Sequence, residues 1–107
     1  MGFEKVREEL TRAVNTLALS PGRIGERLKV ASIDVVSIRE DDAEDFWELI
    51  EWLRGRLLAH GAAPDTVERL SEDECVEIAK EILRVDYLVR MELHERSQRK
   101  SGNPKEP

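Results

Sequence analysis

The chain has one cysteine, few aromatic residues and no long apolar run, and the first and last of these features each exclude a class of protein. Cys75 is the single cysteine among 107 residues, so an intrachain disulfide and a Cys-x-x-Cys metal site are both excluded. No apolar run approaches the roughly 18 residues that a membrane span requires. The chain opens with residues of both charges rather than with a signal peptide. We therefore expect a cytoplasmic protein that does not bind membranes.

Charged residues and apolar residues at helical spacing make up most of the chain. Apolar residues account for 40% of the sequence and charged residues for 37%, which is typical of a single core beneath a strongly hydrated surface. We predict an all-α fold, an antiparallel bundle of about four main helices with a short extra helical turn. Residues 1–96 are expected to form one helical-bundle domain, and the polar residues 97–107 a disordered tail.

Two helices are predicted in the first third of the chain. Apolar residues three and four positions apart indicate one helix over residues 2–19 and a second over about 21–37. Between them, Ser20 is expected to cap the second helix, with Pro21 at its first position. Residues 33–38 are rich in β-branched side chains, which favour a strand. No second strand exists to pair with them, so we predict that they are helical.

Two further helices are predicted in the rest of the chain. Asp41 and Glu44 have the spacing of a capping box, which predicts the start of a third helix that extends to about residue 60. Residues 62–70 are expected to connect it to the last helix. Ser71 and Glu74 form a second capping box at the start of that helix. Its apolar residues cover much of its circumference, which predicts a central position in the bundle.

The formal charge of −6 is unevenly distributed. Residues 1–39 carry a balance of +2, residues 40–81 a balance of −10, and residues 82–107 again +2. An acidic segment repels nucleic-acid backbones and favours basic partners. Nucleic acid is therefore not an expected ligand, but one hypothesis is an acidic mimic of nucleic acid that occupies the basic groove of another protein.

No cofactor or metal site is predicted. The acidic cluster over residues 40–45 lacks the alternating ligands and the turn glycine of a calcium-binding loop, so it is interpreted as a solvated helix start. Cys75 is on an apolar helical stripe with acidic neighbours and is expected to be buried and unreactive. His94 lacks a metal-ligand partner four residues away and is expected at the surface.

Arg54 and His60 are separated by five residues on the predicted third helix. This spacing resembles the motif of HEPN domains, small four-helix bundles whose ribonuclease members carry an arginine, usually a polar residue next, and a histidine four to six positions beyond the arginine. The resemblance implies a cleft between two copies, where His60 exchanges protons and Arg54 steadies a phosphate oxyanion. Gly55 stands where that family usually has a polar residue. The alternative interpretation is that His60 is an exposed residue near a helix end.

Two pairs of residues are predicted to contact a partner. Arg23 and Arg27 are four positions apart near a helix start and are expected to converge on an anion or on an acidic protein surface. Trp47 and Trp52 point about 140° apart at 100° per residue. At least one of them is therefore expected at a groove or rim, where tryptophan is enriched in binding hot spots.

The sequence thus favours a small interaction or regulatory protein without catalytic activity. We expect it to act through helix faces, either as a homodimer or bound to a larger protein. No small-molecule substrate is evident. The first alternative is a HEPN-like ribonuclease, or a degenerate relative, that uses Arg54 and His60; the second is the acidic mimic.

Overall fold

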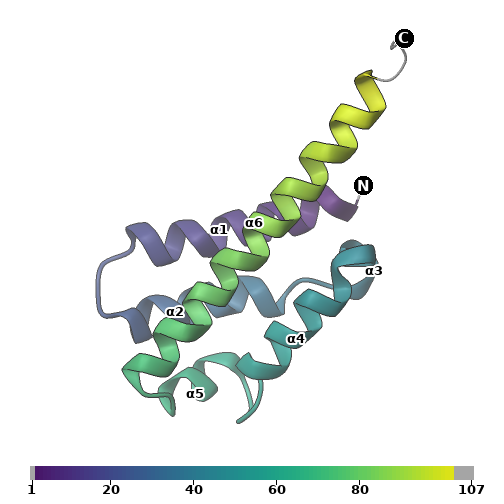
Figure 1. The fold of residues 1–107 in the computed structure, drawn as a ribbon. Coiled ribbons are helices and arrows are strands. Elements are labelled where there is room, and N and C mark those ends of the chain that lie inside the picture. Colours follow the sequence, from purple (N-terminus) through teal and green to yellow (C-terminus); the bar gives the residue numbers. More distant parts are fainter. Residues whose placement is uncertain (1, 103–107) are drawn as a thin grey trace.

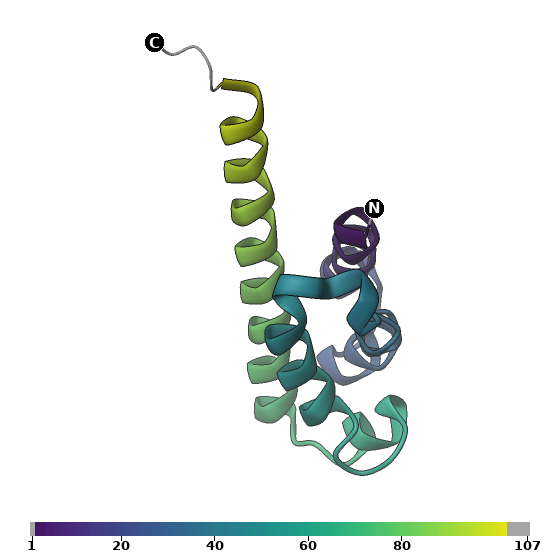
Figure 2. The ribbon, with the colours of Figure 1, turned by 90° about the vertical axis from the view of Figure 1, so that its right-hand side faces the viewer.

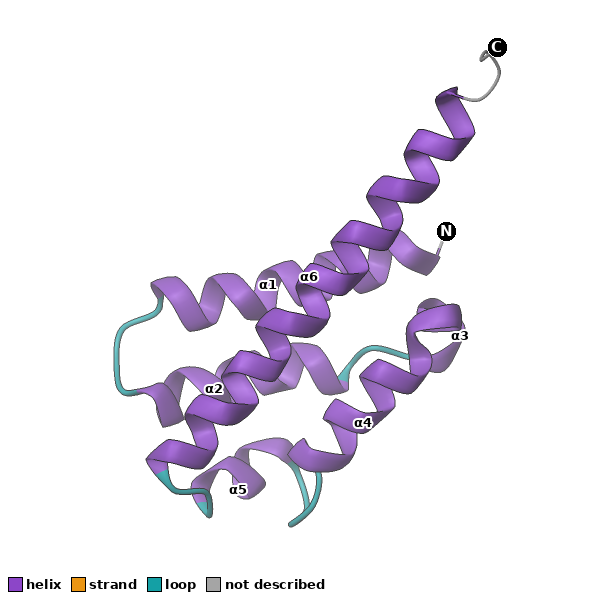
Figure 3. Ribbon diagram, viewed as in Figure 1, coloured by secondary structure: helices purple, strands orange, loops and turns teal. Residues whose placement is uncertain are grey.

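The computed structural model describes residues 2–102 and the side chains of residues 4–99. Within this range the chain forms helices and turns and no strand (Figure 3). Four helices have 11 residues or more: α1 (Gly2–Leu19), α2 (Ile24–Val36), α4 (Trp47–Leu57) and α6 (Glu72–Gly102). The predicted all-α bundle is therefore confirmed. None of the described helices combines the length and the apolar character that a membrane crossing needs.

The first two helices form an antiparallel hairpin (Figure 1). Helix α1 has the predicted bounds. Helix α2, however, begins at Ile24 with Arg23 as its N-cap. The prediction that Ser20 caps this helix, with Pro21 in its first turn, is therefore wrong. The reason is Gly22, whose φ of 103° lies outside the helical range and keeps the preceding residues in the turn. Residues 33–36 are helical as predicted, but Ser37 caps the end of α2 and Ile38 lies beyond it, so the predicted helix does not extend over all of residues 33–38.

The predicted third helix is broken near its start. Helix α3 (Glu40–Ala43) is followed by the 3₁₀ turn η1 (Glu44–Phe46), and α4 begins only at Trp47. The break lies at Glu44, the one non-glycine residue with positive φ among those described (46°). Both Ala43 and Phe46 are buried on either side of it. The chain thus changes direction at Glu44 while the residues on either side of it both lie in the core.

The ends of the later helices also differ from the predictions. Helix α4 ends at Leu57, three residues before His60, and α5 (Ala63–Glu68) supplies the short extra helical segment, with a proline in its first turn. The capping box at the start of α6 is present. The Ser71 amide donates to Glu74 Oε1 over 2.8 Å, and the Glu74 amide donates to Ser71 Oγ over 3.1 Å.

Helix α6 is longer than predicted. It continues to Gly102, although a disordered tail was expected from residue 97, and ion pairs four residues apart support the added turns. The remainder of the predicted tail, residues 103–107, lies outside the described residues. The last turns of α6 extend beyond the other helices (Figures 1 and 2).

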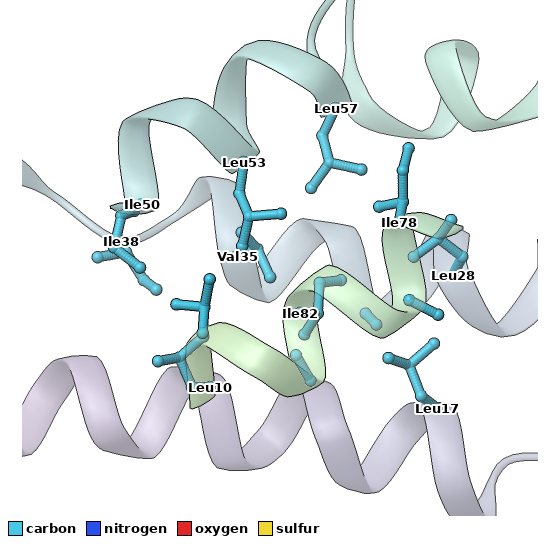
Figure 4. Packing of buried hydrophobic residues seen from close by; sticks show 14 of the residues in the cluster. Leu10, Leu17, Leu28, Val35, Ile38, Ile50, Leu53, Leu57, Ile78 and Ile82 are labelled. Atoms are coloured by element: carbon cyan, nitrogen blue, oxygen red, sulfur yellow. The ribbon is translucent and has the colours of Figure 1, made fainter. Parts of the chain in front are cut away.

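Helix α6 contributes to the core along its first half and packs against α1, α2 and α4. Figure 4 shows Ile78 and Ile82 among leucine and isoleucine side chains from the other helices. Figure 2 shows the rest of the chain on one side of α6. Helix α6 therefore forms one side of the core, and the prediction of a central position in the bundle is wrong, because its outer face is exposed at Leu83, Tyr87 and Met91.

Candidate functional site

A groove of about 520 Å³ separates α4 from α5 and the first turns of α6. It is called the α4 groove below. Its walls combine apolar and polar residues: Trp52, Gly55, Ala59, Leu70 and Ile78 with Glu51, Arg56, His60, Thr66 and Glu74. Three sequence segments contribute to it, so it exists only in the folded bundle. A groove with apolar walls and a few polar groups is the usual form of a binding site.

Trp52 stands at the edge of this groove and is 47% exposed. The guanidinium carbon of Arg56 lies 5.4 Å from the centre of its ring, a distance at which a cation is attracted to an aromatic face. Since Arg56 is one turn further along α4, this contact holds the indole against its own helix. The large apolar surface of Trp52 is thus presented in a restrained orientation.

Gly55 keeps the groove open next to Trp52. A methyl group built at this glycine would meet no atom within 4 Å, and its φ is not in the positive range. The backbone therefore does not need glycine here. Together with Ala59, one turn later, Gly55 makes a shallow face on α4 that an incoming side chain or helix can approach closely.

Trp47 has a different environment from Trp52. It is partly buried and packs against the hydrophobic core. Arg54 covers it, with its guanidinium carbon 5.5 Å from the ring centre. The 140° separation expected from helix geometry thus places one tryptophan at the core and the other on the surface, and Trp52 is the better candidate for a partner contact.

Arg54 and His60 serve separate contacts within this chain. Arg54 Nε donates a hydrogen bond to the carbonyl oxygen of Val36 at the end of α2 over 3.2 Å. His60 is exposed in the turn after α4 and lines the α4 groove, where its backbone amide donates to Thr66 Oγ1 over 3.0 Å. Arg54 is not part of that groove's lining. The two residues do not share one helix, because α4 ends at Leu57.

Arg23 and Arg27 also point to different neighbours. Arg27 Nη1 donates to the carbonyl oxygen of Leu17 over 2.6 Å, which satisfies an open carbonyl in the last turn of α1. Arg23 is exposed and lines a cleft between α2, α5 and the start of α6. The Lys29 ammonium pairs with Glu68 at that cleft, and this hydrogen bond raises the pKa of Lys29.

Cys75 is buried at the bottom of the same cleft, 2% exposed. Burial raises the pKa of its thiol, and the carboxylates of Glu74 and Glu72 raise it further. The thiolate is the reactive form, so this cysteine is held in its unreactive state. Across the described residues, no three His, Cys, Asp or Glu side chains are grouped so that they could hold a metal ion.

Sequence reasoning identified Trp52 but missed the groove beside it. Gly55 entered the sequence argument only as a departure from a motif, and its role in opening the α4 face depends on the positions of α5 and α6. A small residue three positions after an exposed tryptophan was the available signal. That signal has meaning only once the neighbouring helices are known.

Comparison with known proteins adds no function to this geometry. No protein-family model, no curated protein and no solved structure matches the chain significantly.

Proposed function

We propose that this protein is a small non-catalytic interaction protein that binds a protein partner through the α4 groove. The observation that carries the proposal is the exposed indole of Trp52 beside the open face at Gly55. Restrained, exposed tryptophans at the edge of an apolar groove are typical of binding hot spots. The partner is expected to insert an apolar side chain next to Trp52.

The surroundings of the groove indicate the charge of the partner. Glu51 and Glu74 lie among its lining residues, and Glu48 is exposed on α4 one turn before Trp52. An apolar segment flanked by lysine or arginine matches this surface best. The partner is a second copy of the chain or a larger protein, and the oligomeric state separates the two cases.

The first experiment is light scattering on a sizing column at low and high salt. A dimer that Trp52→Ala converts to monomer would identify a second copy as the partner. For a monomer, the partner is sought by affinity capture with wild-type bait and the Trp52→Ala variant. The matched control is Leu19→Ala, because Leu19 is 79% exposed at the end of α1 and belongs to no part of the groove.

The proposal requires Trp52→Ala to weaken association at least tenfold, or about 1.4 kcal/mol, while Leu19→Ala leaves it unchanged. Circular dichroism must show the same helix content in both variants. Equal association of the two variants would refute the α4 groove as the binding surface.

A further inference from the structure

A second pocket lies between the N-terminal half of α1 and the C-terminal half of α6. Its volume is about 340 Å³, and it is lined by Arg7, Arg90, Leu93, His94 and Ser97. It is called the α1/α6 pocket below. The four residues from α6 are spaced by three, one and three positions, so they share one face of that helix. This face meets α1, which crosses α6 here (Figure 1).

The α1/α6 pocket is basic in a protein whose formal charge is −6. Two guanidinium groups, an imidazole and a hydroxyl line it, and no carboxylate does. The nearby carboxylates of α6 are directed elsewhere: Glu92 pairs with Arg96 and with Arg99, and Glu95 pairs with Arg99. The pocket is therefore a local exception to the acidic surface.

Arg90 is held in place by contacts on one side of its guanidinium group. Its Nε donates to Asp86 Oδ2 over 2.8 Å, and its Nη2 donates to Thr11 Oγ1 over 3.0 Å. Asp86 is only 7% exposed, so this anchor is nearly buried. Among the described residues, Nη1 of Arg90 has no hydrogen-bond acceptor. The group is thus oriented before any ligand arrives, which lowers the entropic cost of binding.

Arg7 supplies charge that the protein does not neutralise with an ion pair. Asp86 offsets part of the charge of Arg90, but Arg7 forms no ion pair with any described side chain. Its neighbours Glu4 and Glu8 line the adjoining surface of α1, which Arg7 also lines, but they do not line the pocket itself. An anion placed in the pocket would therefore meet one fixed and one available guanidinium group.

We propose that the α1/α6 pocket binds a phosphate group, either as the free ion or as a monoester. Guanidinium groups match the oxygens of a phosphate in both charge and geometry. The imidazole of His94 is an additional hydrogen-bond donor on the same helix face. Leu93 gives the pocket an apolar wall, which suits the part of the ligand that carries the phosphate. The proposal is independent of the α4 groove.

The test is an amide-resolved NMR titration of the whole chain at constant ionic strength, with sodium chloride as the reference. Three probes separate the sources of the phosphate: inorganic phosphate, phosphoserine and adenosine monophosphate. We expect saturable shifts of the signals of residues 7, 90, 94 and 97. The probe that binds most tightly identifies the ligand as the free ion, a phosphorylated side chain or a nucleotide.

Arg7→Gln is the main variant, because Arg7 is exposed and makes no ion pair whose loss would disturb the fold. It should weaken binding of the tightest probe roughly tenfold, the usual effect of losing one charge-assisted hydrogen bond. Arg69→Gln is the matched control, since it removes the same charge from an exposed position after α5. His94→Gln, a second surface variant, should weaken binding as well.

Three results would overturn the proposal. One is the absence of saturable shifts with all three probes up to tens of millimolar. Another is equal affinity of wild type, Arg7→Gln and His94→Gln. The third is an equal loss of phosphate affinity in Arg7→Gln and Arg69→Gln, which would indicate a general effect of net charge.

Discussion

Arg54 of α4 closes the C-terminal end of α2 by donating a hydrogen bond from Nε to the carbonyl oxygen of Val36 over 3.2 Å. Carbonyl groups in the last turn of a helix have no partner within that helix. The same guanidinium group covers the ring of Trp47 at 5.5 Å. One side chain thereby joins the end of one helix to the start of the next long one.

Replacing Arg54 by methionine should therefore destabilise the fold. The change keeps an apolar side chain over Trp47 but removes the hydrogen bond to Val36, a loss of about 1–2 kcal/mol in the free energy of unfolding. Urea denaturation measures it, with Arg69→Met as the exposed control, expected within about 0.5 kcal/mol of wild type. If Arg54→Met unfolds at the same urea concentration as wild type but abolishes an RNA-cleaving activity, the result would contradict the structural role of Arg54 and support the ribonuclease interpretation.

Replacing Glu44 by glycine should stabilise the protein. Glu44 has φ 46° and ψ −111°, a conformation that glycine adopts without steric cost. Relief of this strain is expected to raise the free energy of unfolding by up to about 1 kcal/mol. Glu48→Gly is the matched control and should lower it by about 1 kcal/mol, because Glu48 lies within α4. Thermal unfolding distinguishes the two variants. A lower free energy of unfolding in both of them would contradict the prediction.

Replacing Ser71 by alanine should weaken the start of α6 and change its pH dependence. Loss of this N-cap costs about 1 kcal/mol. Hydrogen bonds from the Ser71 backbone amide and then from its hydroxyl lower the pKa of Glu74. A carboxyl group with a lowered folded-state pKa stabilises the fold above its unfolded pKa, and this contribution disappears as the pH falls through the folded value.

Urea titrations between pH 7 and about pH 3 measure this effect, since free glutamate titrates near 4.3. The difference between wild type and Ser71→Ala should be largest at neutral pH and shrink in acid. A difference that stays constant across the range would show that the Ser71 hydroxyl does not contribute to the lowered pKa of Glu74.

Replacing Gly55 by alanine should raise the stability of the fold and weaken binding to a partner. A helical glycine costs about 0.5–1 kcal/mol relative to alanine, and a methyl group here meets no atom within 4 Å, so the variant should be more stable. The same methyl group enters the α4 groove and should weaken association. Gly22→Ala is the contrast: its φ of 103° and the Glu26 carboxylate near the added methyl predict destabilisation. Chemical denaturation and light scattering measure the two properties.

The sequence alone was sufficient to predict the structural features that depend on the pattern of neighbouring residues. The bounds of α1 and the Ser71–Glu74 capping box follow from spacing and from hydrogen bonds between near neighbours. The difference between Trp47 and Trp52 follows from helix geometry alone. Each of these involves residues within one or two turns of one another.

The features that the sequence did not predict depend on distant contacts. The break at Glu44 lies between Ala43 and Phe46, which are both buried in a core that other helices complete. The sequence suggests Arg54 and Arg27 as ligand-binding residues. In the fold, their side chains donate hydrogen bonds to carbonyl groups 18 and 10 positions away. The α1/α6 pocket joins residues from nearly opposite ends of the chain, so no local motif indicates it.

The hydrogen bond between Thr11 and Arg90 spans 79 positions, and α6 supplies much of the interior against which α1 packs. During synthesis on the ribosome, α1 and α2 emerge long before that interior exists. Helices α1 and α2 pack against each other, but the parts of their buried faces that meet α6 stay uncovered until α6 leaves the exit tunnel. The core of this bundle is therefore completed only after α6 has been synthesised.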